Sequence, residues 1–247
     1  MFEKLIKFIF DQVDFFIARQ VPSKLGFGHQ IDARKKTDPN IRFIHSIIQN
    51  SLNPIKIIEL ASGRGVLAQE LIKLPTVESY LACDVDEAGI KVLEKRLSDD
   101  DNAHKIKCKV MNCLDNEFTE TECFDVVIAD KLIHLFSPEE IDKVFQFAGK
   151  ILKPCGIFII NSASVNNFVY ERTVEAGENK LYRKLKDDVY TRLWYNITIP
   201  YVFFITLEYI DYVAKQTGFF IVPELVYKND RDYLTLAVCK NKQHQNQ

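Results

Sequence analysis

The feature that most constrains the fold of this chain is an alternation, from residue 55 onward, of short apolar runs with longer amphipathic stretches. This pattern is typical of buried strands joined by crossover helices, as in a parallel α/β sheet. The seven runs that we interpret as strands are 55–60, 79–83, 105–110, 124–129, 157–161, 219–226 and 233–240. Helices are expected at 41–48, 66–73, 87–97, 138–152 and 207–217. Only the short turn 228–231 separates the last two strands, so they should pair antiparallel.

The segment Ser137-Pro138-Glu139-Glu140 predicts a well-defined helix start. Ser137 can cap the helix, Pro138 suits the first helical position, and Glu140 can complete a capping box. The helix should stop before Pro154.

A glycine-containing turn follows the first predicted strand and opens a helix, with the sequence Glu59-Leu60-Ala61-Ser62-Gly63-Arg64-Gly65. Glycine lets the backbone turn sharply and lets a ligand approach main-chain amides without a Cβ in the way. About 20 residues later, Asp84 ends the second strand, where a carboxylate can accept hydrogen bonds from two ribose hydroxyls. The spacing therefore predicts a nucleoside-containing ligand.

The charge of Glu59 distinguishes between two candidate ligands. The stretch from Gly63 to Ala68 also fits the fingerprint of dinucleotide sites. A pyrophosphate at this turn would be repelled by the neighbouring carboxylate of Glu59, whereas S-adenosylmethionine carries an ammonium and a sulfonium group. Charge therefore favours the methyl donor, and the dehydrogenase alternative predicts a preference for a nicotinamide cofactor instead.

The turn from Glu59 to Gly65 resembles the acidic-x-Gly-x-Gly-x-Gly first motif of the class I S-adenosylmethionine-dependent methyltransferases, with Ala61 in place of the first glycine. Asp84 corresponds to the second motif of this family, and Asn112-Cys113 to its adenine-contacting position. Further segments that resemble family motifs, in the same order, are 124–130, 132–135, 152–156 and 204–219. The likeness covers roughly residues 50–240.

The resemblance implies a Rossmann-like, doubly wound α/β fold: a mostly parallel seven-stranded sheet with an antiparallel C-terminal strand, plus an N-terminal helical cap. We expect residues 1–50 to form that cap and residues 51–247 to form the methyltransferase domain, with an irregular, polar and aromatic insertion at about 162–200. The implied cofactor is S-adenosylmethionine, and no metal site is expected. The residues expected to contact the cofactor are Glu59, Ala61, Gly63, Gly65, Asp84, Val85, Asn112, Cys113 and Asp130.

Two residues depart from the family pattern. Ala61 adds a methyl group where the backbone usually packs closely against the donor, so we expect a modest loss of affinity. Asn112 replaces the more frequent Asp, and its amide can serve the adenine N1 or N6.

Methyl transfer is an in-line displacement in which the cofactor carries the reactive group, so a catalytic side chain is not obligatory. His134 is the candidate general base, because its unperturbed pKa suits proton transfer near neutrality; a packed or capping histidine is the alternative. The insertion offers candidates for an acceptor pocket, or equally for a lid packed on the edge of the sheet. These are Tyr170, Arg172, Tyr190, Trp194 and Tyr195.

Charge bears on the acceptor. The net charge is −2 and the pI is about 6.2, without the basic excess of proteins that bind nucleic acid over their whole surface. The motif Asn-Pro-Pro-Tyr is also missing. A small-molecule acceptor methylated at O or N is favoured, and a protein or RNA acceptor is the next choice. A degenerate member of the fold that serves as a binding scaffold stays open.

Residues 1–20 are apolar at helical spacing but carry six charged residues, which is not the pattern of a membrane span or signal peptide. An amphipathic helix packed on the domain is expected, with a helix on a membrane surface as the alternative. The connector residues His29, Arg34 and Lys35 would close over the same edge of the sheet as the insertion. The six cysteines show no C-x-x-C spacing, so a zinc-finger framework is not indicated. We expect reduced thiols and a cytoplasmic location.

Overall fold

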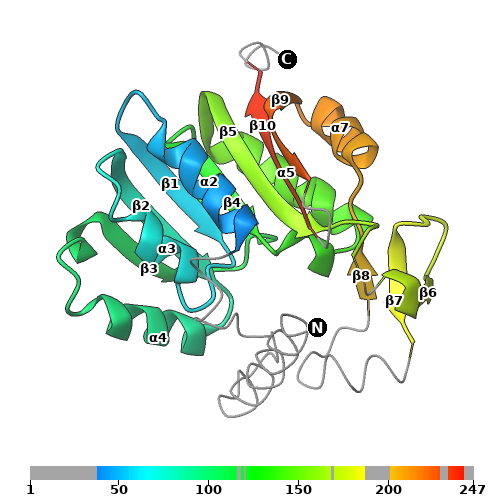
Figure 1. The fold of residues 1–247 in the computed structure, drawn as a ribbon, viewed down its shortest axis with the longest axis horizontal. Coiled ribbons are helices and arrows are strands. Elements are labelled where there is room, and N and C mark those ends of the chain that lie inside the picture. The colour runs from blue at the N-terminus through cyan, green and yellow to red at the C-terminus, as the bar shows by residue number, and fades with distance from the viewer. Residues whose placement is uncertain are drawn as a thin grey trace, which may run out of the picture.

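The computed structural model describes residues 38–115, 118–119, 121–167, 170–186, 201–228 and 233–241. Its main feature is a seven-stranded sheet with the order β3-β2-β1-β4-β5-β10-β9 (Figure 1). The strands are β1 (Ile55–Leu60), β2 (Val77–Asp84), β3 (Ile106–Val110), β4 (Phe124–Asp130), β5 (Leu152–Ala163), β9 (Phe219–Lys228) and β10 (Tyr233–Lys240). The five strands from β3 to β5 are parallel, and β10 pairs antiparallel with β5 and β9. The predicted fold class is confirmed.

Helices cover both faces of this sheet and give the molecule three layers (Figure 1). One face is covered by α2 (Pro39–Gln49), α3 (Val66–Leu71) and α4 (Glu87–Leu97), and the other by α5 (Pro138–Ile151) and α7 (Leu207–Gln216). Successive residues of a strand point to opposite faces, so Ile57 packs with the first helix group and Ile58 with the second. Burial on both faces explains why these strands are almost continuous apolar runs in the sequence.

A second, smaller sheet follows β5, where the sequence predicted an irregular segment. Its strands are β6 (Thr173–Glu175), β7 (Tyr182–Leu185) and β8 (Tyr201–Phe203), which pair antiparallel in that order. The prediction was wrong for this described part, because strands of three or four residues are too short to display a clear alternation. The limits of the insertion, 162–200, stay a prediction.

The N-terminal cap predicted over residues 1–50 lies mostly outside the described residues, and α2 is its described part. This helix begins beside Asp38, whose side chain accepts a hydrogen bond from the Asn40 amide. Among the helices that the structure describes, none is both long and apolar enough to cross a membrane.

Candidate cofactor site

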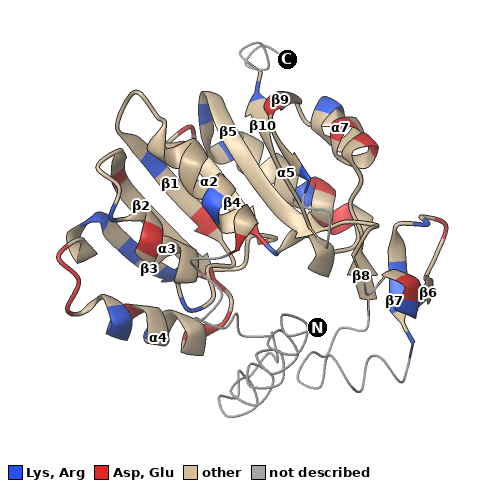
Figure 2. Cartoon of the chain, in the orientation of Figure 1, with Lys and Arg blue, Asp and Glu red and all other residues tan. Residues whose placement is uncertain are grey.

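Polar side chains occupy the carboxyl ends of the parallel strands on one face of the sheet. These side chains form a row across the sheet: Glu59 on β1, Asp84 on β2, Asp130 on β4 and Asn161 on β5. Thr235 on the neighbouring strand β10 extends the row. On all five strands the residue two positions further into the sheet is buried and apolar, so the face changes from apolar to polar at this edge. Figure 2 shows acidic residues where β1 and β4 end. In open α/β sheets, ligands bind at the carboxyl ends of the strands.

The turn between β1 and α3 holds three residues in the left-handed backbone region: Ala61 at φ 59°, Gly63 at φ 55° and Gly65 at φ 72°. Its two glycines have different physical roles. A Cβ on Gly65 would collide with the side chain of Leu93 on α4, so this glycine allows the turn to pack on that helix. A Cβ on Gly63 would meet no atom of the described chain within 4 Å. Among the described residues, nothing therefore fills the space beside Gly63, as is required where a ligand lies on the backbone.

Asp84 ties the end of β2 to this turn. Its carboxylate accepts hydrogen bonds from the amide of Gly63 at 2.7 Å and from that of Asp86 at 2.8 Å. Burial raises the pKa of Asp84, and the two amide hydrogen bonds offset part of that rise. Each carboxylate oxygen has a second lone pair, so Asp84 can fix the turn and still accept a ligand hydroxyl.

Glu59 is buried and has a partner that the sequence analysis missed. The hydroxyl of Tyr80 on β2 donates a hydrogen bond of 2.7 Å to its carboxylate. Burial raises the pKa of Glu59 to about 8; the Tyr80 hydrogen bond lowers it, and the nearby charges of Asp130 and Asp84 raise it further. Without a ligand, the Glu59 carboxyl is therefore protonated in most molecules at pH 7. The available signal in the sequence was the spacing of Tyr80 and Asp84: four residues apart on one strand, their side chains point to the same face of the sheet.

Val85, predicted to contact the cofactor, lies in the loop after β2, and Asn112 and Cys113, predicted to contact adenine, lie in the loop after β3. Val85 directly follows Asp84 and is 40% exposed. The Asn112 oxygen accepts a hydrogen bond from the Leu114 amide, and its nitrogen donates to Asp115, so this side chain shapes its own turn. Cys113 is half-buried, and burial raises the pKa of its thiol to about 12, which keeps it neutral. Their contact with adenine stays a prediction.

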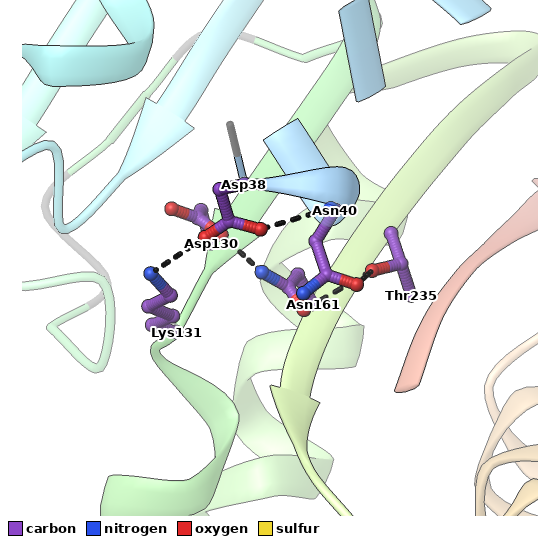
Figure 3. Close-up of polar contacts among 6 residues, drawn as sticks. All are labelled: Asp38, Asn40, Asp130, Lys131, Asn161 and Thr235. Carbon is purple, nitrogen blue, oxygen red and sulfur yellow. Dashed lines mark hydrogen bonds and ion pairs between the residues drawn. The ribbon is translucent and has the colours of Figure 1, made fainter. Parts of the chain in front are cut away.

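Asp130, at the end of β4, is held by a side chain of the neighbouring strand. The Asn161 amide donates a 2.5 Å hydrogen bond to its carboxylate (Figure 3). The next residue, Lys131, has a left-handed backbone at φ 56° and pairs with Asp38 at 3.4 Å. Burial lowers the pKa of Lys131, but the charges of Asp130, Tyr233 and Asp38 raise it more, so the pKa is raised overall. Lys131 and Asn161 were not predicted as site residues; polar residues that interrupt the strand ends were the available signal in the sequence.

His134 is buried within the short 3₁₀ turn η3 (Ile133–Leu135). Its Nδ1 lies 3.5 Å from the Ser162 hydroxyl, and its ring packs edge-on against Tyr233. Burial lowers the pKa of His134 to about 4, with a further contribution from Lys131. The imidazole is therefore neutral at pH 7 and a weaker base than an exposed histidine. Its catalytic role stays a prediction.

The substrate-binding prediction is only partly within the described residues, because Tyr190, Trp194 and Tyr195 lie outside them. Tyr170 packs edge-on against Phe204 and carries the Arg183 guanidinium over its ring at 4.5 Å. The same apolar cluster includes Tyr233, which contacts His134 and Lys131. Arg172 ends the short turn η4 (Tyr170–Arg172) and is exposed. The structure thus brings Tyr170 into the region of β4 and β10.

Comparison with known proteins agrees with this geometry. Residues 57–156 match the family described as a methyltransferase domain. Among solved structures, an S-adenosylmethionine-dependent methyltransferase from Methanosarcina mazei is similar with a TM-score of 0.64 at 15% identity, covering 79% of this chain and 97% of that one. The 1,6-didemethyltoxoflavin-N1-methyltransferase from Burkholderia thailandensis, solved with 1,6-didemethyltoxoflavin and S-adenosylhomocysteine, has a TM-score of 0.59 at 14% identity, covering 83% and 80%. At these identities the likeness shows the fold.

A curated relative, the thermospermine synthase ACAULIS5 of Arabidopsis thaliana, is 23% identical over an alignment of 155 residues that covers 58% of this chain. The match spans 44% of the length of that relative. The match to the methyltransferase-domain family includes the turn with Gly63, the Asp84 strand end and the Asp130 strand end, which are among the residues that carried the resemblance. The predicted resemblance is confirmed: residues 57–156 match a methyltransferase-domain family, and the fold is that of solved S-adenosylmethionine-dependent methyltransferases.

Proposed function

We propose that this protein transfers a methyl group from S-adenosylmethionine to an oxygen or nitrogen atom of a small-molecule acceptor. The observation that carries the proposal is the open space beside Gly63, whose amide is hydrogen-bonded to Asp84 and whose turn begins directly after Glu59. The buried hydroxyl of Ser62, in the same turn, has no hydrogen-bond partner among the described residues. Buried polar atoms rarely stay unpaired, so this hydroxyl also supports a polar ligand at the turn.

The residues present suit the parts of S-adenosylmethionine. We assign the ribose to Asp84, the adenine to Val85 and the 112–113 turn, and the amino-acid end to the turn at Gly63. The carboxyls of Glu59 and Asp130 lie where the ligand carries an ammonium group, and that positive charge favours the ionised form of Glu59. When bound, the cofactor supplies an electrophilic methyl group on a sulfonium.

The acceptor is assigned to the ends of β4 and β5 and the insertion. Support for a small molecule comes from the fold neighbour of Burkholderia thailandensis, an N1-methyltransferase solved with 1,6-didemethyltoxoflavin. His134 is neutral at neutral pH, so in this proposal it can accept a proton from the acceptor without first losing one. All six cysteines are free thiols, which supports a cytoplasmic site of action.

The test is calorimetric titration with S-adenosylhomocysteine, with NADH as the comparison ligand. We expect micromolar binding of S-adenosylhomocysteine and none of NADH. Gly63→Asn should weaken binding at least about tenfold, because Asn tolerates the left-handed backbone yet fills the space beside the turn.

Gly177→Asn is the matched control. Gly177 is exposed, and a Cβ there would also meet nothing within 4 Å, but it lies between β6 and β7, away from the turn. Its affinity should equal that of the wild type. Binding of NADH alone would favour a dehydrogenase, and binding of neither ligand would favour a scaffold. Acceptor screening with small molecules, proteins and RNA then separates the remaining alternatives.

A further inference from the structure

A chain of side-chain hydrogen bonds joins three strands and one helix behind Asp130. Asp130, Asn161 and Thr235 are direct neighbours in the register of β4, β5 and β10. The Asn161 nitrogen donates to Asp130, and the Thr235 hydroxyl lies 3.1 Å from the Asn161 oxygen. The same hydroxyl lies 3.0 Å from the Asn40 side chain on α2 (Figure 3). All four residues are buried.

The chemistry of this chain gives it a direction. A threonine hydroxyl has one hydrogen, so it donates to one amide and accepts from the other. If Thr235 donates to the Asn161 oxygen, the Asn161 nitrogen is left to donate to Asp130. Rotation of the Asn40 amide by half a turn then lets its nitrogen donate to Thr235. Each donor along the chain then points toward the carboxylate of Asp130, and such directed bonds strengthen one another.

Packing alone does not require polar groups at these positions. The next residues into the sheet on the same face are Ile128, Ile159 and Ala237, which are fully buried and apolar. Burying an amide or hydroxyl has a desolvation cost that apolar side chains avoid. Thr235 also lies on β10, two strands away from β4 and outside the parallel part of the sheet. A chain that ends on one carboxylate instead restricts where that carboxylate points.

We infer that Asn40, Thr235 and Asn161 are positioning residues, which hold the Asp130 carboxylate toward the ammonium group of the bound methyl donor. This inference rests on the proposed function, because it takes the ammonium of the donor as the partner of Asp130. Through Asn40, it links α2 and the C-terminal strand β10 to the ligand-binding edge.

The test compares two ligands in a Thr235→Val variant, which removes the hydroxyl and keeps the shape. S-adenosylhomocysteine carries the ammonium group, whereas methylthioadenosine shares its adenosine and sulfur and lacks the amino-acid part. We expect S-adenosylhomocysteine to bind about tenfold more weakly, the size expected for loss of one buried hydrogen bond from the chain, with methylthioadenosine unchanged. Thr235→Ser keeps the hydroxyl and should bind both ligands as the wild type does.

Two further variants separate positioning from general destabilisation. Thr76 donates its hydroxyl to the Ile48 carbonyl at the other end of α2, so Thr76→Val removes a comparable hydrogen bond away from Asp130. It should leave the ratio of the two affinities unchanged. Asp130→Asn should itself weaken S-adenosylhomocysteine selectively, and adding Thr235→Val to it should produce no further selective loss.

An equal loss for both ligands, no loss in Thr235→Val, or failure of Thr235→Ser to restore binding would overturn the inference. In these cases the wild type still binds, and the proposed function stands. Wild-type protein that binds neither ligand would instead contradict the proposed function, and the inference with it.

Discussion

At the scale of single residues, the turn after β1 combines backbone strain with an open surface. Ala61 has a left-handed backbone without being glycine, which costs about 1–2 kcal/mol. Strained residues of this kind gather at binding sites, where the surrounding structure holds them in place. The substitution of Ala61 for the family's glycine therefore affects the backbone of the turn as well as the ligand surface.

Ala61→Gly should relieve this strain. The gain is partly offset by the greater freedom of glycine in the unfolded chain, so we expect the free energy of unfolding to rise by about 0.5–1 kcal/mol. Affinity for S-adenosylhomocysteine should be equal or modestly higher. Urea denaturation and calorimetry measure the two effects, and a less stable variant would show that Ala61 is not strained.

Glu59 should make the ligand-free protein less stable as the pH rises from about 5 to 8. Its pKa is raised to about 8 in the folded protein against about 4.5 in the unfolded chain, so the native state holds this proton more strongly over that range. Glu59→Gln cannot titrate but keeps an oxygen for the Tyr80 hydroxyl. Thermal unfolding across this pH range should therefore show a smaller decline in the variant, and equal slopes would contradict the account.

Ligand binding should show the opposite pH dependence. The ammonium of S-adenosylhomocysteine favours the ionised form of Glu59, so affinity should rise with pH, by up to about tenfold per unit, and level off above about pH 8. Calorimetric titrations at several pH values test this. In Glu59→Gln this pH dependence of the affinity should be lost. If the affinity of the wild type is equally independent of pH, Glu59 does not interact with the charge of the ligand.

At the scale of elements, local sequence signals predicted the helix starts well. The Ser137 hydroxyl accepts a hydrogen bond from the backbone amide of Glu140, and the Glu140 carboxylate accepts one from the backbone amide of Ser137. The predicted capping box of α5 is therefore present. The strands β6, β7 and β8 escaped prediction because each has only three or four residues, which is too short to show its own period. Propensity and capping act locally, whereas pairing of short strands depends on the whole fold.

Ser137→Ala should lower the free energy of unfolding by about 1 kcal/mol, since it removes one half of the capping box. Ser137→Asp keeps an oxygen that can accept the same amide, and its stability should stay close to that of the wild type. Chemical denaturation of the three proteins gives the comparison. An alanine variant as stable as the wild type would mean that the cap contributes nothing measurable to α5.

At the scale of the whole molecule, the parallel sheet brings residues from distant segments to one edge. The sequence predicted Glu59, Asp84 and Asp130 for that edge, because each lies at the end of an apolar run. It did not predict the bond of Tyr80 to Glu59 or that of Thr235 to Asn161, which join residues 21 and 74 positions apart. Such pairs are decided by strand register and strand order, which no local pattern encodes.

The most direct test of the central claim is a crystal structure of the protein with S-adenosylhomocysteine. We expect the ribose hydroxyls at Asp84, the adenine beside Val85 and the turn at Asn112, and the amino-acid end on the backbone at Gly63. A ligand bound elsewhere on the molecule, with this turn unoccupied, would contradict the account.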